Sequence, residues 1–220
     1  MVSGSERPDR VQQHRTFVDA AVAADVEHVV YVSFYGAAAD ATFTLARDHW
    51  ATEEHIRASR LSWTFLRDNL YLDFFTAMVG DDGMIRGPAG DGRVAAVAQD
   101  DIADVAEKVL RAPSAHAGSV YQLTGPDALS LAEVADVLSG ATQRVVGYVP
   151  ETVDEAYRSR AHYGAPDWQI DAWVSTYTAI AAGELAQTTD DVERVTGRPP
   201  VSLTDLLTAR AGQVRLGAPL

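Results

Sequence analysis

The sequence predicts an α/β protein in which a parallel sheet is followed by a smaller, mainly helical C-terminal portion. Patterns typical of amphipathic helices alternate with short apolar runs along the first two thirds of the chain, and only helical patterns follow residue 149. The 220 residues, of which 47% are hydrophobic and 22% charged, are also enough for one domain or one and a half with a large core.

Two helix-and-strand units open the chain. Residues 11–25 have helical periodicity, and residues 28–33 (HVVYVS) form a continuous apolar run typical of a buried parallel strand. A second helical stretch covers residues 42–59, and residues 62–66 (SWTFL) have the length and β propensity of the next strand. The face of the first helix that is predicted to be buried consists of Val11, His14, Phe17, Val18, Ala21 and Val22.

The middle of the chain carries turn and helix-start signals. The glycines of residues 80–92 predict a hairpin, and residues 93–98 predict a strand. Asp100 or Asp101 is the expected N-cap of the following helix. Residues 120–124 (VYQLT) predict another strand, which Gly and Pro then end.

The last third is expected to be mostly helical. Ser130 and Glu133 have the spacing of a capping box, in which each residue bonds to the other's backbone N–H. Residues 145–149 predict a short strand. Beyond it, the clearest helical face consists of Ile170, Trp173, Val174, Tyr177 and Ile180.

Composition excludes several classes of function. The chain has no Cys, so no disulfide framework, thiolate nucleophile or Cys-ligated metal is expected. Its net charge is −13, and its basic residues are scattered arginines apart from Lys108, which argues against a nucleic-acid partner. The N-terminus lacks the apolar core of a secretion signal, and no apolar run is long enough to span a membrane. A cytoplasmic protein with no membrane partner is therefore expected.

Several catalytic motifs are missing. The Tyr-x-x-x-Lys pair of short-chain dehydrogenases cannot form, because the residue four places before Lys108 is Asp104. No nucleophile elbow, Walker A motif or H-E-x-x-H motif occurs, and the histidines lack metal-ligand spacing, so no metal site is expected. No G-x-G-x-x-G turn is present either, so this sequence contains no predicted cradle for a dinucleotide's phosphates.

Polar residues at strand ends are the candidate site residues, because ligands of open α/β sheets bind at the carboxyl ends of parallel strands. Ser33 ends the first predicted strand and is either a ligand contact or a turn-capping hydroxyl. His49 lies one helical turn before Glu53, which could hold its ring and raise its pKa; the alternative is a surface histidine with the same partner.

The second predicted strand leads to a similar set. Asn69 and Tyr71 could present an amide and a phenol to a flat aromatic ligand. The alternatives are that Asn69 caps the following segment and that Tyr71 belongs to the core. Arg67 is expected to pair with Asp48, Asp68 or another acid rather than with substrate.

Seven short motifs occur in order along residues 2–210. They are R-x-x-Q-H (Arg10, Gln13, His14), HVVYVS, D-H-x-x-T-E (Asp48, His49, Thr52, Glu53), SWTFLRDNLY (62–71), GPAGDGRVAAVAQDDIADVA (87–106), YQLTGPDALSLAEVADVLS (121–139) and TGRPP (196–200). In this succession the chain resembles NmrA-like proteins, specifically the type 2 NAD(P)H:quinone oxidoreductases.

The resemblance implies an atypical short-chain dehydrogenase with a doubly wound, Rossmann-like sheet. It also implies an NADP or NAD cofactor bound across the strand ends and direct hydride transfer to a small-molecule quinone or similar electrophile. A donor near the quinone oxygen stabilises the negative charge that develops there. The catalytic residues that it implies are His49 and Tyr71, and the cofactor-binding residues are Ser3, Gly4, Ser33, His49, Asn69 and Leu70.

Relative to that family, this sequence starts late. Residues 1–3 read as the end of a strand, so the first three strands of the doubly wound sheet, with the glycine-rich turn, are expected to be missing, which makes cofactor affinity doubtful. Three explanations fit: a native start further upstream, stabilisation of the exposed sheet edge in a homodimer, or a decayed gene. The expected divisions are 1–128, the remaining cofactor domain, and 129–220, a smaller substrate-side domain.

Three functions are compatible with these features. The first is an NAD(P)H-dependent quinone reductase, active in its complete form. The second is a non-catalytic NAD(P)-sensing regulator, since NmrA-like proteins include such sensors. The third is an inactive truncated remnant.

Overall fold

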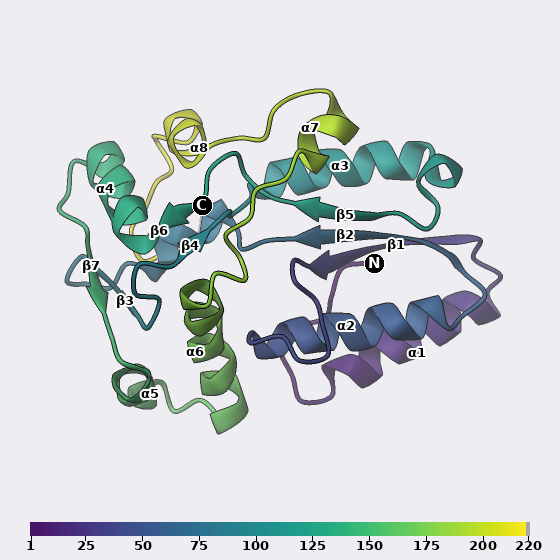
Figure 1. Cartoon of the computed structure of the whole chain (residues 1–220), viewed down its shortest axis with the longest axis horizontal. Helices are drawn as coiled ribbons and strands as arrows, with labels where there is room; N and C mark the ends of the chain where they lie inside the picture. Colours follow the sequence, from purple (N-terminus) through teal and green to yellow (C-terminus); the bar gives the residue numbers. More distant parts are fainter. Residues whose placement is uncertain (219–220) are drawn as a thin grey trace.

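A three-stranded parallel sheet forms the centre of the larger part of the molecule. The computed structural model describes residues 1–218. The strands β1 (His28–Phe34), β2 (Ser62–Asp68) and β5 (Val120–Leu123) are arranged in the order β1-β2-β5 (Figure 1). The strands predicted at residues 28–33, 62–66 and 120–124 are confirmed. The strand β1 lies at an edge of the sheet, where Met1 exchanges backbone hydrogen bonds with Val30 and Val32.

Helices cover both faces of this sheet. The helices α1 (Arg10–Ala23) and α2 (Thr44–Arg57) lie on one face, and α3 (Gln99–Arg111) and α7 (Asp191–Thr196) lie on the other (Figure 1). Apolar side chains alternate across β1, with Val29 and Tyr31 in one core cluster and Val30 in another. The arrangement confirms the predicted α/β class with a doubly wound sheet.

The first helix buries a more polar face than predicted. Arg10, His14 and Val18, spaced four residues apart, are its buried residues, whereas Phe17 is 52% exposed. Phe17 was expected inside because it is apolar. The inward face is set instead by the polar groups that Arg10 and His14 contact in α2 and in the loop before α1.

A second part of the molecule is built from short elements. The loop after β2 continues into the 3₁₀ helix η1 (Leu72–Met78), and α6 (Asp167–Ala181) stands between this part and the sheet (Figure 1). The remaining elements are β3 (Met84–Gly87), β4 (Arg93–Val94), η2 (Pro113–His116), β6 (Leu129–Ser130), α4 (Leu131–Thr142), β7 (Gly147–Pro150), α5 (Val153–Arg160), η3 (Ala161–Tyr163) and α8 (Leu203–Ala209).

The predicted hairpin at residues 80–92 is wrong. The strand β3 pairs in parallel with β7, which is far away in the sequence, and only a single bridge joins Val79 to Ile85. Gly87 lets β3 lie close to α6, because a Cβ there would lie 2.2 Å from the Tyr177 ring. The predicted strand at 93–98 shortens to β4, which pairs antiparallel with β6.

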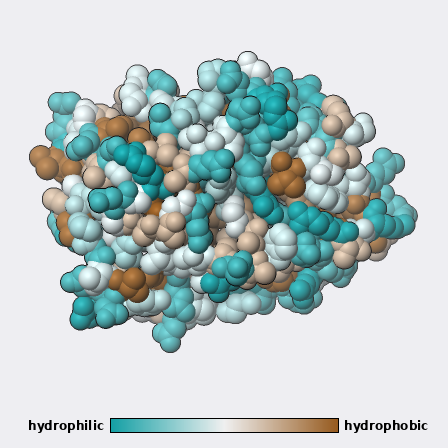
Figure 2. All heavy atoms as spheres, viewed as in Figure 1, coloured by the Kyte–Doolittle hydropathy of each residue, from teal (hydrophilic) through white to brown (hydrophobic). Residues whose placement is uncertain are grey.

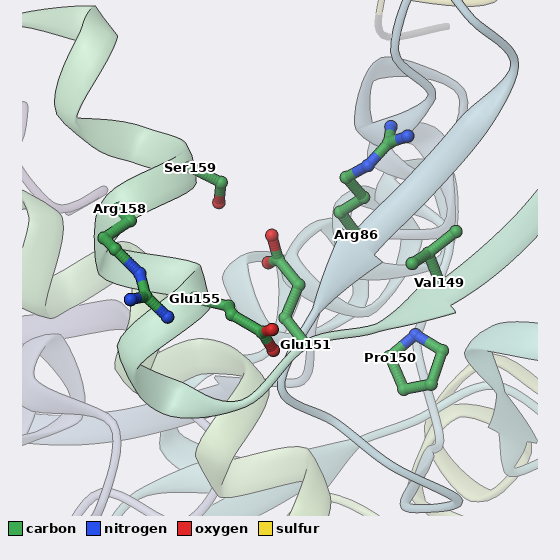
Figure 3. A pocket seen from close by; sticks show the side chains of 7 residues that line it. All are labelled: Arg86, Val149, Pro150, Glu151, Glu155, Arg158 and Ser159. Atoms are coloured by element: carbon green, nitrogen blue, oxygen red, sulfur yellow. The ribbon is translucent and has the colours of Figure 1, made fainter.

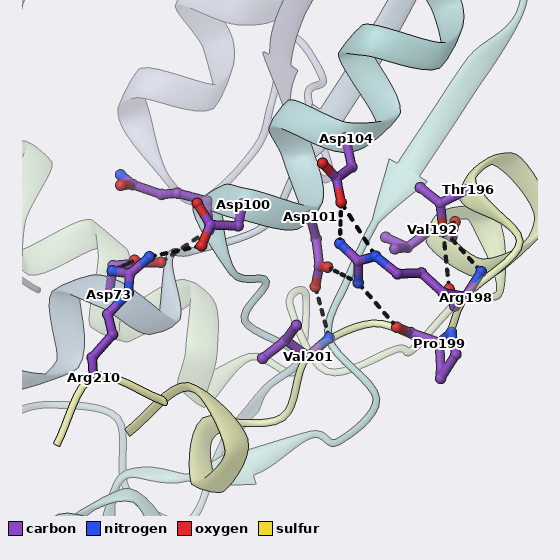
Figure 4. Close-up of polar contacts among 11 residues, drawn as sticks. Asp73, Asp100, Asp101, Asp104, Val192, Thr196, Arg198, Pro199, Val201 and Arg210 are labelled. Atoms are coloured by element: carbon purple, nitrogen blue, oxygen red, sulfur yellow. Dashed lines mark hydrogen bonds and ion pairs between the residues drawn. The ribbon is translucent and has the colours of Figure 1, made fainter. Parts of the chain in front are cut away.

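The helix-start signals have mixed outcomes. The capping box of Ser130 and Glu133 is confirmed at the start of α4. The predicted cap at Asp100 or Asp101 is wrong, since α3 begins at Gln99 after Ala98 and has no side-chain cap. Both carboxylates bind arginines of the C-terminal segment instead (Figure 4).

Those arginines, Arg198 and Arg210, join the C-terminal segment to α3 and η1 through ion pairs. Arg198 pairs with Asp101 and Asp104, and Arg210 bridges Asp73 and Asp100 (Figure 4). The largest apolar cluster likewise contains residues from both sides of position 128, so the domain division there stays a prediction. The face shown in Figure 2 is mostly hydrophilic, with apolar groups scattered singly over it.

Candidate active site

A cleft of about 800 Å³ opens at the carboxyl ends of β1 and β2. The register explains its position, because Ser33 lies beside Arg67 and Phe34 beside Asp68, so that the polar residues after both strands reach the same edge. The opposite walls come from η1, β3, η3 and α6. Aromatic side chains form much of the lining: Phe34, Phe43, Tyr71, Phe74, Phe75, Tyr163, Trp173 and Tyr177.

His49 is buried in the wall of this cleft, and both of its ring nitrogens have partners. Arg10 Nη2 lies 3.1 Å from Nε2, and the Tyr31 hydroxyl lies 3.0 Å from Nδ1. Arginine can only donate, so Nε2 accepts and the proton of the neutral ring is on Nδ1. Burial, together with the positive charge of Arg10, holds the pKa of His49 well below its ordinary value.

The predicted partnership between His49 and Glu53 is wrong, and so is the surface alternative. Because α2 packs against β1, both side chains are buried. Glu53 accepts hydrogen bonds from Ser33 (2.6 Å) and from Arg67 (2.8 and 2.6 Å) instead. The expectation that Arg67 pairs with an acid is confirmed. Since Ser33 donates its proton to Glu53, its hydroxyl can only accept from a ligand.

Asn69 is fully buried and its amide is used within the chain. Nδ2 donates to the Leu185 carbonyl at 3.0 Å, and Oδ1 accepts from the Leu70 N–H at 2.8 Å. This side chain therefore fixes the loop in which Leu70 and Tyr71 line the cleft. It shapes the wall of the cleft, and its predicted contact with the cofactor stays a prediction.

Tyr71 brings a phenol to the cleft. Its hydroxyl donates to Asp68 Oδ2 at 2.8 Å, and both residues line the cavity. Burial is the main reason that the pKa of Asp68 is raised to about 8. Burial and the nearby Asp68 also raise the pKa of the Tyr71 phenol.

The segment before α1 supports the same wall. Ser3 lines the cleft, whereas Gly4 lies behind it, where its carbonyl accepts from Arg10 Nε at 3.0 Å. The Gly4 N–H donates to His14 Nε2 at 2.8 Å. Ser3, Ser33, His49, Asn69, Leu70 and Tyr71 thus lie at one cleft with Gly4 beside it, and their functional roles stay predictions.

Arg10 has an unused nitrogen. Its side chain is buried and borders the cleft, but Nη1 has no hydrogen-bond partner within residues 1–218, and the nearest carboxylate oxygen, on Asp48, is 3.7 Å away. An unpartnered buried guanidinium nitrogen suits a hydroxyl, phosphate or carboxylate oxygen. With the flat aromatic walls and a volume typical of small-molecule sites, the residues present fit the nicotinamide end of a dinucleotide.

Two cleft residues were not singled out from the sequence. Arg10 appeared there only within a motif, and Asp68 only as a partner for Arg67. The four-residue spacing of Arg10 and His14 on one helix face was an available signal. Within residues 1–218 Asp68 forms no ion pair with an arginine, and no sequence pattern predicts this.

A second hollow of about 620 Å³ lies between α5 and the paired strands β3 and β7 (Figure 3). Its polar side chains are largely engaged. Glu151 pairs with Arg160 at 2.9 Å, Glu155 caps α5 through Thr152, and Arg86 pairs with Asp82. It is the weaker candidate site.

Metal and membrane features are not found in the described part of the chain. Within residues 1–218, no three His, Asp or Glu side chains gather as ligands for a metal ion. None of the helices there has the length and apolar character needed to cross a membrane.

Comparisons with known proteins agree on one family. The family model described as "NmrA-like family" matches residues 1–165. The NAD(P)H azoreductase of Xenophilus azovorans is 33% identical over 93% of this chain and 72% of its own length. Quinone oxidoreductase 2 of Escherichia coli is 28% identical over 93% of this chain and 72% of its own.

Solved structures of two reductases share the fold of this chain. An NADPH-dependent quinone oxidoreductase from Escherichia coli, in complex with NADPH, superposes with a TM-score of 0.84 at 27% identity, covering 94% of this chain and 74% of its own. The triphenylmethane reductase of Citrobacter sp. superposes with a TM-score of 0.82 at 28% identity, covering 97% and 75%.

Proposed function

Because the chain belongs to the NmrA-like family, we propose that it is an NAD(P)H-dependent oxidoreductase that reduces a flat conjugated acceptor of the quinone or azo class. The observation that carries the proposal is the cleft, in which the Tyr71 phenol and the Arg10 guanidinium, whose Nη1 lacks a hydrogen-bond partner within residues 1–218, border aromatic walls at the ends of parallel strands. The substrate class comes from the names of two relatives, an azoreductase and a quinone oxidoreductase.

In this proposal the two ends of the cleft differ in chemistry. Ser3, Ser33 and the free nitrogen of Arg10 hold the polar sugar and phosphate side of the cofactor, whether NADP or NAD. Leu70, positioned by Asn69, and the aromatic residues flank the flat rings. The nicotinamide supplies the hydride when it is bound.

The side chains of the protein orient the acceptor and handle its charge. When an acceptor binds, the Tyr71 hydroxyl turns its one proton from Asp68 Oδ2 to the acceptor atom that becomes negative. His49 acts through Arg10, because both of its ring nitrogens are engaged and it has no free N–H for the substrate. The apolar walls exclude water and hold the two rings face to face.

The proposal is tested with the purified 220-residue chain. Oxidation of NADPH or NADH is followed with and without 1,4-benzoquinone or an azo dye, and the expected result is oxidation that depends on the acceptor. An oxidation rate that is the same with and without the acceptor contradicts the proposal. Cofactor binding without any turnover would instead support an NAD(P)-sensing regulator.

The variant Tyr71→Ala separates chemistry from binding. It is expected to lower turnover about 100-fold, the lower end of what a general acid contributes, while cofactor affinity changes much less. The matched control is Tyr157→Phe, whose phenol binds Asp171 outside the cleft and which should leave both values unchanged. Equal losses of turnover and affinity in Tyr71→Ala would mean that Tyr71 is only a core residue.

A further inference from the structure

Asp68 differs from the other buried acids of the described chain. Each of the others forms an ion pair with at least one arginine, whereas Asp68 takes part in none of the ion pairs found within residues 1–218. The paired acids are Glu53 with Arg57 and Arg67, Asp73 with Arg210, Asp101 with Arg198, and Asp191 with Arg194. A buried carboxyl without a counterion is far more stable with its proton than without it.

Within residues 1–218, Tyr71 is the one side chain that bonds to the Asp68 carboxyl, at 2.8 Å, and both residues border the cleft. The position follows from the fold, because Asp68 is the last residue of β2 and Tyr71 ends the short loop that Asn69 fixes before η1. The neighbouring Tyr35 N–H donates to the Asp68 backbone carbonyl, a bond that fixes the main chain at the end of β2.

We propose that Asp68 is the proton reservoir for Tyr71 and that the two form a proton-donating pair for the reduced acceptor. This inference rests on the proposed function and adds the source of the proton. The reductant is the nicotinamide cofactor, which gives two electrons and one proton as hydride. The second proton leaves the Tyr71 oxygen for the acceptor oxygen or nitrogen.

Charge and atoms balance along this route. Once the Tyr71 proton has turned from Asp68 to the acceptor, the protonated Asp68 carboxyl donates to the phenol oxygen across the same 2.8 Å contact. Its proton passes to that oxygen as the phenolic O–H bond breaks, so no phenolate accumulates. Asp68 is left as a carboxylate and takes a proton from solvent after product leaves. The acceptor has then gained one hydride and one proton, which is the two-electron reduced product.

The environment of Asp68 suits this role. Burial raises its pKa to about 8, so that the carboxyl holds its proton at neutral pH yet can release it to a stronger base. The groups that share its surroundings do not neutralise it. They are Tyr31 from β1, Tyr35 just after β1, His49 from α2, which is neutral, and Arg10 from α1, which is bonded to His49 and Gly4 and lies 3.7 Å from the Asp48 carboxylate.

A purely structural role for Asp68 makes a different prediction. If the carboxyl only holds Tyr71 in place, Asp68→Asn should work equally well, since an amide oxygen accepts the same hydrogen bond. If Asp68 supplies a proton, Asp68→Asn should lower kcat about 100-fold with little change in KM. The wild-type kcat should fall above about pH 8, and this descending limb should be absent from the variant.

The protonation state is measured independently of turnover. In wild-type protein carrying ¹³C-labelled aspartate carboxyls, and without cofactor, one carboxyl signal absent from Asp68→Asn is expected to be protonated at pH 7 and to titrate near pH 8. Tyr71→Phe, which keeps the packing and removes the hydroxyl, should keep that carboxyl protonated and also lose turnover. An Asp68 signal that is ionised at pH 7 overturns the inference.

The two proposals fail separately. If wild-type protein shows no acceptor-dependent oxidation, the proposed function fails, and the carboxyl titration still decides whether Asp68 can store a proton. If turnover is present and Asp68→Asn keeps both the wild-type rate and the fall in kcat above pH 8, the proposed role of Asp68 is overturned. The proposed oxidoreductase function is then unaffected. Should Asp68→Asn fail to fold, Asp68→Glu is the substitute and should shift the limb without abolishing it.

Discussion

Two buried histidines are built into the structure in their neutral form. His14 accepts from the Gly4 N–H at Nε2 and lies 2.8 Å from Thr52 Oγ1 through Nδ1. A second proton on His14 would set an N–H against the N–H of Gly4. His49 meets the same limit, because Arg10 already donates to its Nε2. Each ring therefore accepts a hydrogen bond at Nε2, and these bonds join α1 and the segment before it to α2 behind the cleft.

This arrangement predicts a loss of stability in acid. Burial lowers the pKa of His14 from 6.5 to about 4, so the unfolded chain binds a proton more readily than the folded one below pH 6.5. The free energy of unfolding should fall by about 3 kcal/mol from this group as pH drops from 6.5 to 4. Urea denaturation at several pH values measures it. His14→Gln should lose that part of the pH dependence; an unchanged curve would contradict the assignment.

Residues that follow strands were predictable, and buried charges were not. Ser33 and Tyr71 were predicted at the cleft because strand ends can be read from apolar runs. Whether an Arg or Asp is buried depends on partners that tertiary folding brings together. Arg10 meets His49 from another helix, and Asp68 is distinctive only because no arginine reaches it.

Elements with strong local signals were likewise the ones predicted well. The strands β1, β2 and β5 are continuous apolar runs, and α4 begins at its predicted capping box. The strand β3 was mistaken for half of a hairpin because its glycines signal a turn, whereas its partner β7 lies far along the chain. Such pairing between very short strands has no local sequence pattern.

One of the two arginines that join the C-terminal segment to α3, Arg198, is the counterion of a buried carboxylate. Arg198 Nη1 donates to Asp101 Oδ1 at 2.7 Å, and the other carboxylate oxygen accepts from the Val201 N–H at 2.8 Å. Asp101 is completely buried, so removal of its cation leaves a buried charge without a counterion.

Arg198→Gln is therefore expected to lower the free energy of unfolding by about 3 kcal/mol or more. The matched control is Arg111→Gln, at an exposed pair with Glu107 on the same helix, which should change stability by less than about 1 kcal/mol. Urea denaturation of both variants compares them. Similar small effects would show that the Asp101 site does not need its cation.

At the scale of the whole molecule, the cleft is shared by parts far apart in the sequence. Its lining includes Ser33 and Tyr71 beside the sheet and Trp173 and Tyr177 on α6. The Asn69 side chain also bonds to the Leu185 carbonyl, which ties the loop after β2 to the segment after α6. A ligand in the cleft therefore contacts both parts at once.

Ligand binding should consequently stabilise the molecule as one unit and be visible at Trp173. With NADPH at about 100 times its Kd, the free energy of unfolding should rise by about 2.7 kcal/mol, and thermal unfolding should stay a single transition at higher temperature. Fluorescence should be quenched in the same titration, and Trp173→Phe should remove most of the quenching. Trp63→Phe is the control, since that ring stacks on Phe65 outside the cleft. Quenching that survives in Trp173→Phe, or two separate transitions of which only one shifts, would place the ligand elsewhere.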